Sequence, residues 1–184
     1  MRRTLYIPII AAIALALVAG VVLFFPQLRN LVSKSGAPTV SDIQVQVPPL
    51  TQKYTNDTLR FTFNYSEGYM VREVASETGM SVLIEDQVSG KGVQIYVTPY
   101  ADSDTTITQE RVENEVGDMS VIDPQPIVLS AGGGEGLAFK SDNPDFGGNS
   151  REAWFIVGGH LYQISTYAEY DELLQAIFAT WTFF

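Results

Sequence analysis

The segment from residue 141 to 149 contains the side chains of this sequence that are best suited to bind a cation. It reads SDNPDFGGN, and its two carboxylates belong to Asp142 and Asp145. Carboxylate and amide oxygens are the ligands that hard cations such as Ca²⁺ prefer, but an EF-hand register that starts at Asp142 places Pro144 and Ala153 where ligands are required. We therefore expect solvated turns rather than a defined metal site, with Asp142 and Asp145 as the candidates for weak cation binding.

Other residues that catalysis would need are sparse. His160 is the one histidine, and the sequence has no cysteine and no Gly-x-Ser-x-Gly motif to present a serine nucleophile. The glycine-rich run at residues 131–136 lacks the Lys-Ser/Thr ending of a phosphate-binding loop. We expect His160 to flank a tight turn, the glycine-rich run to lead into a strand, and the chain to bind no cofactor.

Acidic residues are abundant, which leaves one catalytic alternative open. From residue 53 onward the chain has 20 Asp and Glu against 7 Lys and Arg, a net charge of −13. Two of these carboxylates, if they met in a cleft, would suit a hydrolase that cleaves glycosidic bonds. The same charge repels phosphate backbones and anionic lipid surfaces, so the sequence predicts no nucleic-acid partner.

The elements that must position these residues begin with an apolar N-terminal run. Residues 5–25 contain no charge, and 13 of the 21 are Leu, Ile, Val or Phe. At about 1.5 Å per residue, a helix of this length spans roughly the hydrocarbon core of a bilayer. A cleaved signal peptide has a shorter apolar run and ends in small residues, whereas this run ends in bulky ones. We predict an uncleaved transmembrane anchor that contacts the lipid bilayer through residues 5–25.

The charges that flank this run predict its orientation. Arg2 and Arg3 lie before the run, and a large polar body follows it. By the positive-inside rule we expect residues 1–4 in the cytoplasm and the body on the outer side of a cell membrane, in a single-pass arrangement. Residues 26–52 are rich in Ser, Gly and Pro and are expected to form a stalk, and residues 53–184 one extracytoplasmic domain.

Small residues in the apolar run suggest contact between two anchors. Ala12, Ala16 and Gly20 recur every four positions and would share one face of a helix. Small residues on one face let membrane helices approach closely. The alternative is that alanine is merely common in this run, so a helix-mediated dimer is a hypothesis.

Alternation of apolar and polar residues predicts an antiparallel sheet of about six or seven strands in the domain. The expected strands lie at residues 59–65, 69–75, 81–87, 92–98, 136–141, 151–157 and 160–167. Gly158-Gly159 between the last two is a signal for a two-residue hairpin. Pro124 and Pro126 interrupt the pattern, and short strands at residues 41–47 and 180–184 stay open.

Two helices are expected to pack with this sheet. Thr106 and Gln109 have the spacing of a capping box, which predicts a helix from there to about Val116. A second helix at residues 169–179 presents one apolar stripe, made of Leu173, Leu174, Ile177, Phe178 and Trp181. Because strands and helices do not alternate regularly, the pattern favours an α+β fold over a dinucleotide-binding fold.

Two stretches of this pattern resemble a known family. The run FTFNYSEGY at residues 61–69 resembles the aromatic strand, turn and Gly-aromatic opening of PsbP-like domains, and residues 159–184 resemble their closing strand, helix and strand. Those domains often have Pro where Ser66 lies here and Trp where Tyr69 lies. The resemblance spans about residues 53–184 and implies an antiparallel sheet flanked by helices that acts as a non-enzymatic assembly or binding module. Members include extrinsic subunits of the oxygen-evolving photosystem and a Ran-binding relative, and no residue role carries over.

From these observations we expect a single-pass membrane-anchored protein whose extracytoplasmic domain binds a partner without catalysis, with a protein as the candidate partner. The alternatives are a hydrolase that acts at the cell envelope and a structural component of an envelope complex. A polar cleft with converging carboxylates would favour the hydrolase, and an exposed apolar patch would favour the structural component.

Overall fold

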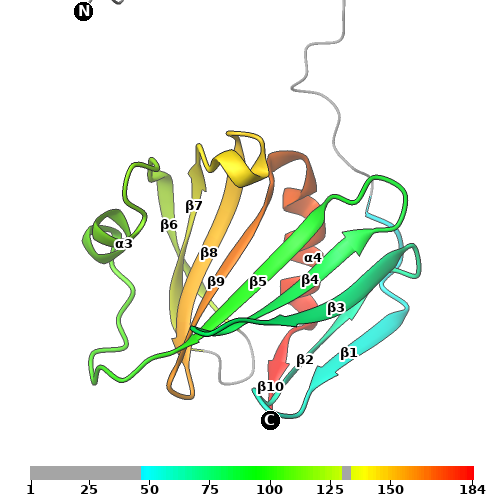
Figure 1. Cartoon of the computed structure of the whole chain (residues 1–184), viewed down its shortest axis with the longest axis horizontal. Helices are drawn as coiled ribbons and strands as arrows, with labels where there is room; N and C mark the ends of the chain where they lie inside the picture. The colour runs from blue at the N-terminus through cyan, green and yellow to red at the C-terminus, as the bar shows by residue number, and fades with distance from the viewer. Residues whose placement is uncertain (1–46, 130–133) are drawn as a thin grey trace, which may run out of the picture. The chain divides into compact units, whose positions relative to one another are not determined.

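The structure, a computed structural model, describes residues 47–129 and 134–184. Two α-helices and ten strands form in these residues (Figure 1). The strands are β1 (Gln52–Asn56), β2 (Phe61–Tyr65), β3 (Tyr69–Ala75), β4 (Met80–Asp86), β5 (Gly92–Pro99), β6 (Ile122–Val128), β7 (Glu135–Ser141), β8 (Ser150–Val157), β9 (His160–Tyr167) and β10 (Thr182–Phe183). The helices are α3 (Gln109–Glu115) and α4 (Asp171–Thr180), with short 3-10 turns η3 (Pro144–Phe146) and η4 (Ala168–Tyr170).

The strands form two sheets in which neighbours run antiparallel. Seven strands pair in the order β3-β4-β5-β9-β8-β7-β6, and three pair in the order β1-β2-β10. The predicted α+β class and antiparallel pairing are confirmed. The large sheet has the predicted six or seven strands, but the prediction of a single sheet is wrong, because the aromatic strand β2 pairs with β1 and β10 in a second sheet.

Two local patterns of the sequence are seen in the structure: the alternation of burial along β2 and the glycine turn of the β8–β9 hairpin. Phe61 and Phe63 are fully buried, whereas Thr62 between them is half-buried. Gly158 and Gly159 have φ values of 60° and 76°, so both central residues of the hairpin turn lie in the left-handed region that glycine adopts at little cost. The hairpin predicted at Gly158-Gly159 is confirmed.

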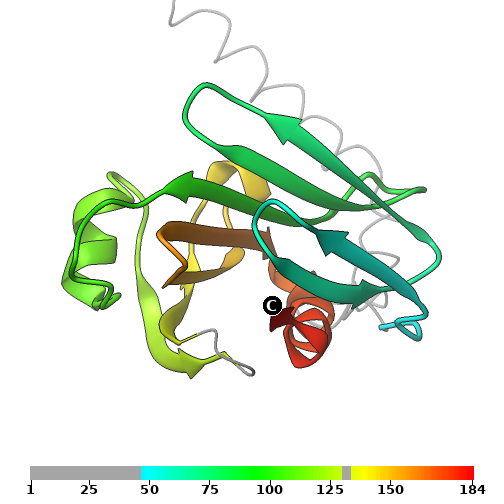
Figure 2. The ribbon, with the colours of Figure 1, turned by 90° about the horizontal axis from the view of Figure 1, so that it is seen from below.

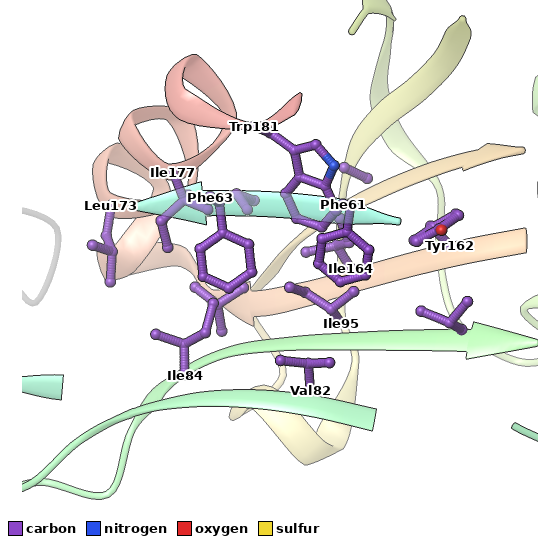
Figure 3. Packing of buried hydrophobic residues seen from close by; sticks show 14 of the residues in the cluster. Phe61, Phe63, Val82, Ile84, Ile95, Tyr162, Ile164, Leu173, Ile177 and Trp181 are labelled. Carbon is purple, nitrogen blue, oxygen red and sulfur yellow. The ribbon is translucent and has the colours of Figure 1, made fainter. Parts of the chain in front are cut away.

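The main core lies between the large sheet, the three-stranded sheet and α4 (Figure 3). Phe61 stacks on Trp181 with ring centroids 4.6 Å apart, and Phe63 lies 5.3 Å from the same indole. The predicted apolar stripe of the last helix faces this core, with Leu173, Leu174, Ile177 and Trp181 buried and Phe178 half-buried. Aromatic stacking of this kind fixes the small sheet and the C-terminal helix to each other.

A second apolar cluster covers part of the opposite face of the large sheet. Val112 of α3 is fully buried and belongs to the same cluster as Trp154 and Ile156 of β8. This placement explains why a helix of only seven residues is stable here, since short helices depend on tertiary packing.

The helix boundaries differ from those predicted. The cap of α3 is Thr108 rather than Thr106, and its Oγ1 accepts a hydrogen bond from the backbone N–H of Arg111 at 3.2 Å. Thr106 instead donates its backbone N–H to the carboxylate of Asp104. Helix α4 begins at Asp171, two residues later than predicted, because η4 precedes it.

The edge strand β6 was not expected, because Pro124 and Pro126 lie within it. Proline lacks an N–H and is tolerated in a sheet only where that position needs no ladder bond, as on an edge. Strand β6 is the last strand of the large sheet, and its pairing with β7 shifts register between Ile122 and Gln125, where Asp123 has a φ of 50°. The two prolines therefore belong to an irregular edge strand rather than to a loop.

Several predictions of the sequence concern residues outside those that the structure describes. They are the membrane anchor at residues 5–25, its packing face of Ala12, Ala16 and Gly20, most of the stalk at residues 26–52, and residues 130–133 of the glycine-rich run. Across residues 47–129 and 134–184, no helix combines the length and the apolar composition that crossing a bilayer requires. The end of the stalk is described, and there Val47 and Leu50 pack against the main core.

Candidate binding groove between α4 and β6

An open groove runs along one face of the large sheet, between helix α4 and the edge strand β6. Helix α4 lies between the three-stranded sheet and the β6–β7 hairpin (Figure 2). Beyond it, two small residues face each other in register, Ala138 of β7 and Ala153 of β8. Because neither fills the space beside the helix, a hollow of about 360 Å³ opens there, walled by Ile127 of β6 and by Leu174 and Phe178 of α4.

A second hollow extends the first toward the end of β6. Its volume is also about 360 Å³, and Ile127, Gln175 and Phe178 line both hollows. Val128, Leu129 and Ala179 complete its apolar lining. The two hollows therefore form one groove, which we call the α4–β6 groove, with an apolar floor and a glutamine on each side.

One end of the groove is closed by a paired set of polar side chains. Arg151 donates from Nε and Nη2 to the two carboxylate oxygens of Asp171, at 2.9 Å and 3.0 Å. Gln175 donates to the same carboxylate at 3.1 Å. The parallel two-bond geometry holds both charges in place and leaves the groove with no net charge at this end.

The outer wall of the groove is the exposed end of β6. Val128 is 80% exposed, a high value for a β-branched residue in a strand, and lies beside Ile127. A third hollow of about 410 Å³ opens on the other face of this strand, and it too contacts Ile127 and Val128. The end of β6 is thus a thin apolar wall with a hollow on either side.

The predicted cation candidates do not converge in the structure. The Asp142 carboxylate accepts hydrogen bonds from the backbone N–H of Ser120 at 2.6 Å and from its hydroxyl at 3.1 Å. These bonds, the backbone bond first, hold the pKa of Asp142 below its ordinary value. Asp145 lies on η3 in a separate shallow hollow beside Phe146. In the described part of the chain, no three His, Asp or Glu side chains gather as a metal site would require.

His160 and the acidic tip near residue 102 have local partners. The Nδ1 atom of His160 lies 3.0 Å from the carbonyl oxygen of Gly158, within the same hairpin turn. Asp102 and Asp104 both face Arg111, at 3.7 Å and 3.3 Å. These contacts agree with the interpretation of His160 as a turn-flanking residue and give the acidic tip a structural role around α3.

The burial of the Glu152 carboxylate was not predicted from the sequence. Glu152 is only 2% exposed and accepts hydrogen bonds from Ser150 at 2.6 Å, Ser165 at 2.5 Å and Asn143 at 3.2 Å. Burial raises the pKa of Glu152, and the three hydrogen bonds oppose this in part. Its donors are all neutral, and Asn143 also caps η3, so Glu152 ties that turn to the sheet.

The groove also escaped the sequence reasoning, for a clear reason. Its floor depends on Ala138 lying opposite Ala153, and this register joins two strands whose pairing no local pattern specifies. Its wall depends on β6, which was not predicted as a strand because it contains Pro124 and Pro126. The one usable signal was the apolar run Ile127-Val128-Leu129 after the prolines.

Comparison with known proteins identifies a fold but no family membership. No protein-family model matches the chain, and no curated protein sequence matches it. Among solved structures, it is similar to the solution structure of cyanobacterial PsbP (CyanoP) from Synechocystis sp. PCC 6803, with a TM-score of 0.51 and 14% identity. The match covers 76% of this chain and 96% of that one. The PsbP-like fold that the sequence suggested is therefore confirmed, and at this identity the likeness concerns the fold alone.

Proposed function

We propose that this chain is a membrane-tethered accessory module that binds a segment of a protein partner in the α4–β6 groove and catalyses no reaction. The observation that carries the proposal is the groove itself, a mainly apolar trough open to solvent, in which Arg151 and Asp171 neutralise each other and the buried Glu152 completes the charged lining. Protein segments bind hollows of this kind by burying a few apolar anchor side chains. The likeness of the fold to cyanobacterial PsbP supports the accessory class.

The chemistry of the groove supports binding over catalysis. Its half-buried carboxylate, Asp171, is bound by Arg151 and Gln175, so it is poorly placed to take a proton from a substrate. The buried carboxylate Glu152 is held by three neutral donors and faces no second acid among its hydrogen-bond partners. A glycosidase would need two carboxylates across an open cleft.

The tether rests on the sequence before the described residues. Residues 5–25 are long and apolar enough to cross a bilayer, with Arg2 and Arg3 on the short side. A domain held at a membrane surface meets other membrane proteins at a raised effective concentration. Weak contacts in an open groove are then sufficient for function, which suits an accessory role.

Peptide display on the full chain in detergent tests the groove. We expect random peptides to be enriched on the parent protein and lost on Ala138→Phe, which fills the first hollow from its floor. Ala101→Phe, at an exposed position outside the groove, is the matched control and should retain the peptides. Circular dichroism of both variants checks that the fold is unchanged.

Two results would overturn the binding proposal. One is the absence of any enriched peptide, and the other is a set of peptides that bind Ala138→Phe as well as they bind the parent. The tether has its own test, because alkaline carbonate extraction leaves a spanning protein in the membrane pellet. Recovery of the whole chain in the supernatant, or a mature N-terminus beyond residue 25, would remove the tether and leave the groove proposal standing.

A further inference from the structure

The distance between the two hollows of the α4–β6 groove sets the spacing of the side chains that fill them. On β6, the first hollow contacts Gln125 and Ile127 and the second contacts residues 127–129, an offset of about two residues or 6–7 Å. On α4, the lining moves by about three residues, which corresponds to about 4–5 Å. Side chains on one face of an extended segment lie about 6–7 Å apart, so two residues at i and i+2 match the offset of the hollows along the β6 wall.

The polar groups at the sides of the groove suit the backbone of an extended segment. Gln125 and Gln175 are both exposed, one on the strand wall and one on the helix wall. A glutamine amide both donates and accepts, as a peptide bond does. An extended segment needs partners for its backbone groups when it is buried, whereas a helix satisfies its own. The prolines of β6 withhold main-chain donors at positions 124 and 126, so side-chain amides are the better source.

The charge around the groove selects for a basic segment. Five of the seven Lys and Arg side chains after residue 52 form ion pairs with acids, so the uncompensated charge of the domain is acidic. Near the groove, the exposed Glu172 follows Asp171 on α4, and the exposed Glu135 lies by the third hollow, on the other face of β6. A flanking cation on the occupant would meet this field favourably.

We infer that the occupant of the α4–β6 groove is an extended segment of a partner protein with two apolar side chains two residues apart and a Lys or Arg beside them. The inference rests on the proposed function and adds the chemistry of the partner. The first apolar side chain fills the hollow above Ala138 and Ala153, and the second fills the hollow beside Leu129 and Ala179. The two glutamines hold the backbone between these anchors.

Fluorescence anisotropy with a synthetic peptide from the display selection, added to the full chain in detergent, tests this inference. We expect replacement of either anchor by Ala to weaken binding about tenfold or more, because each anchor loses its buried apolar surface. One glycine inserted between the anchors should weaken binding by a similar factor. Gln175→Leu should weaken it about fivefold, as loss of about one hydrogen bond does, and Gln94→Leu on the other face of the sheet is the matched control.

Salt and sequence pattern separate this inference from the proposed function. Raising NaCl from about 0.05 M to about 0.5 M should weaken the binding of the peptide that carries the cation and leave the binding of its uncharged version unchanged. Groove-dependent peptides with anchors at i and i+3 or i+4, or without cations, would overturn the inference while the groove remains a binding site. Groove-dependent self-association of the chain would also overturn it, since the occupant would then be a second copy. Absence of any groove-dependent peptide would overturn both proposals.

Discussion

Ala138 and Ala153 are direct cross-strand partners, and together they line the first hollow of the α4–β6 groove. Their environments differ in spite of this symmetry. Ala153 is 1% exposed, enclosed by the neighbouring strands and α4, whereas Ala138 is half-buried and borders the open side. One pair of methyl groups thus marks the boundary between the packed core and the groove.

The same substitution at these two alanines should have opposite effects on stability. Ala138→Leu extends into the hollow and should raise the free energy of unfolding by about 0.5 kcal/mol or more, as cavity filling does. Ala153→Leu enlarges a side chain that is only 1% exposed and belongs to the main core, so overpacking should lower it by about 1–3 kcal/mol. Urea denaturation of the two variants and the parent measures both changes. Equal losses at the two sites would show that the hollow is not available to a side chain.

The buried carboxylate of Glu152 should make stability depend on pH. Because burial raises its pKa in the folded state, the folded chain binds more protons than the unfolded chain between the ordinary carboxyl pKa and the raised one. Its contribution to stability is therefore full at low pH and is lost as pH rises through that interval. Glu152→Gln should lose this dependence and, at neutral pH, be at least as stable as the parent.

Urea denaturation across a pH series checks this prediction, with Asp145→Asn as the control at an exposed acid nearby. Ser165→Ala should steepen the loss with pH, because it removes a hydrogen bond that favours the charged form of Glu152. The account of Glu152 would be contradicted if the free energy of unfolding of the parent rose with pH over this interval as much as that of Glu152→Gln.

The prolines of β6 should protect an exposed edge from pairing with other chains. Replacing both Pro124 and Pro126 by Thr restores two backbone N–H donors beside the exposed Val128. At about 1 kcal/mol for each of the two main-chain hydrogen bonds, the double variant should self-associate about thirtyfold more tightly than the parent. Sedimentation velocity in detergent measures the change, and Pro144→Thr in η3 is the control that should not associate.

Loss of the aromatic contact between β2 and α4 should destabilise the domain strongly. Phe63 is fully buried between Tyr54 and Trp181, with centroids 5.0 Å and 5.3 Å away. Phe63→Ala should cost about 3–5 kcal/mol, the usual range for a buried phenylalanine. Phe183→Ala, at a half-buried position of β10, should cost clearly less in the same denaturation assay. Similar costs at both sites would mean that the core between the sheets is less enclosed than the structure shows.

Elements with a strong local pattern were predictable, and elements that depend on position in a sheet were not. The hairpin at Gly158-Gly159 and the apolar stripe of α4 follow from residues close together in the chain. Strand β6 could not be recognised, because proline is excluded from central strands but accepted at an edge, and the edge position is a property of the whole sheet. The separation of β2 into a second sheet likewise depends on partners more than a hundred residues away, in β10.

By itself, the amino-acid sequence determined the fold class, most strand positions, the acidic surface and the absence of cysteine chemistry, because each of these follows from residue types and local periodicity. Tertiary structure alone decided that Ala138 meets Ala153, that Glu152 is buried among neutral donors, and that β6 stands free beside α4. These features are set by cross-strand register and by which face of a sheet is left uncovered, and both depend on residues that are distant in the chain. The candidate groove is formed by this register and by this uncovered face, so it can be recognised only in the folded chain.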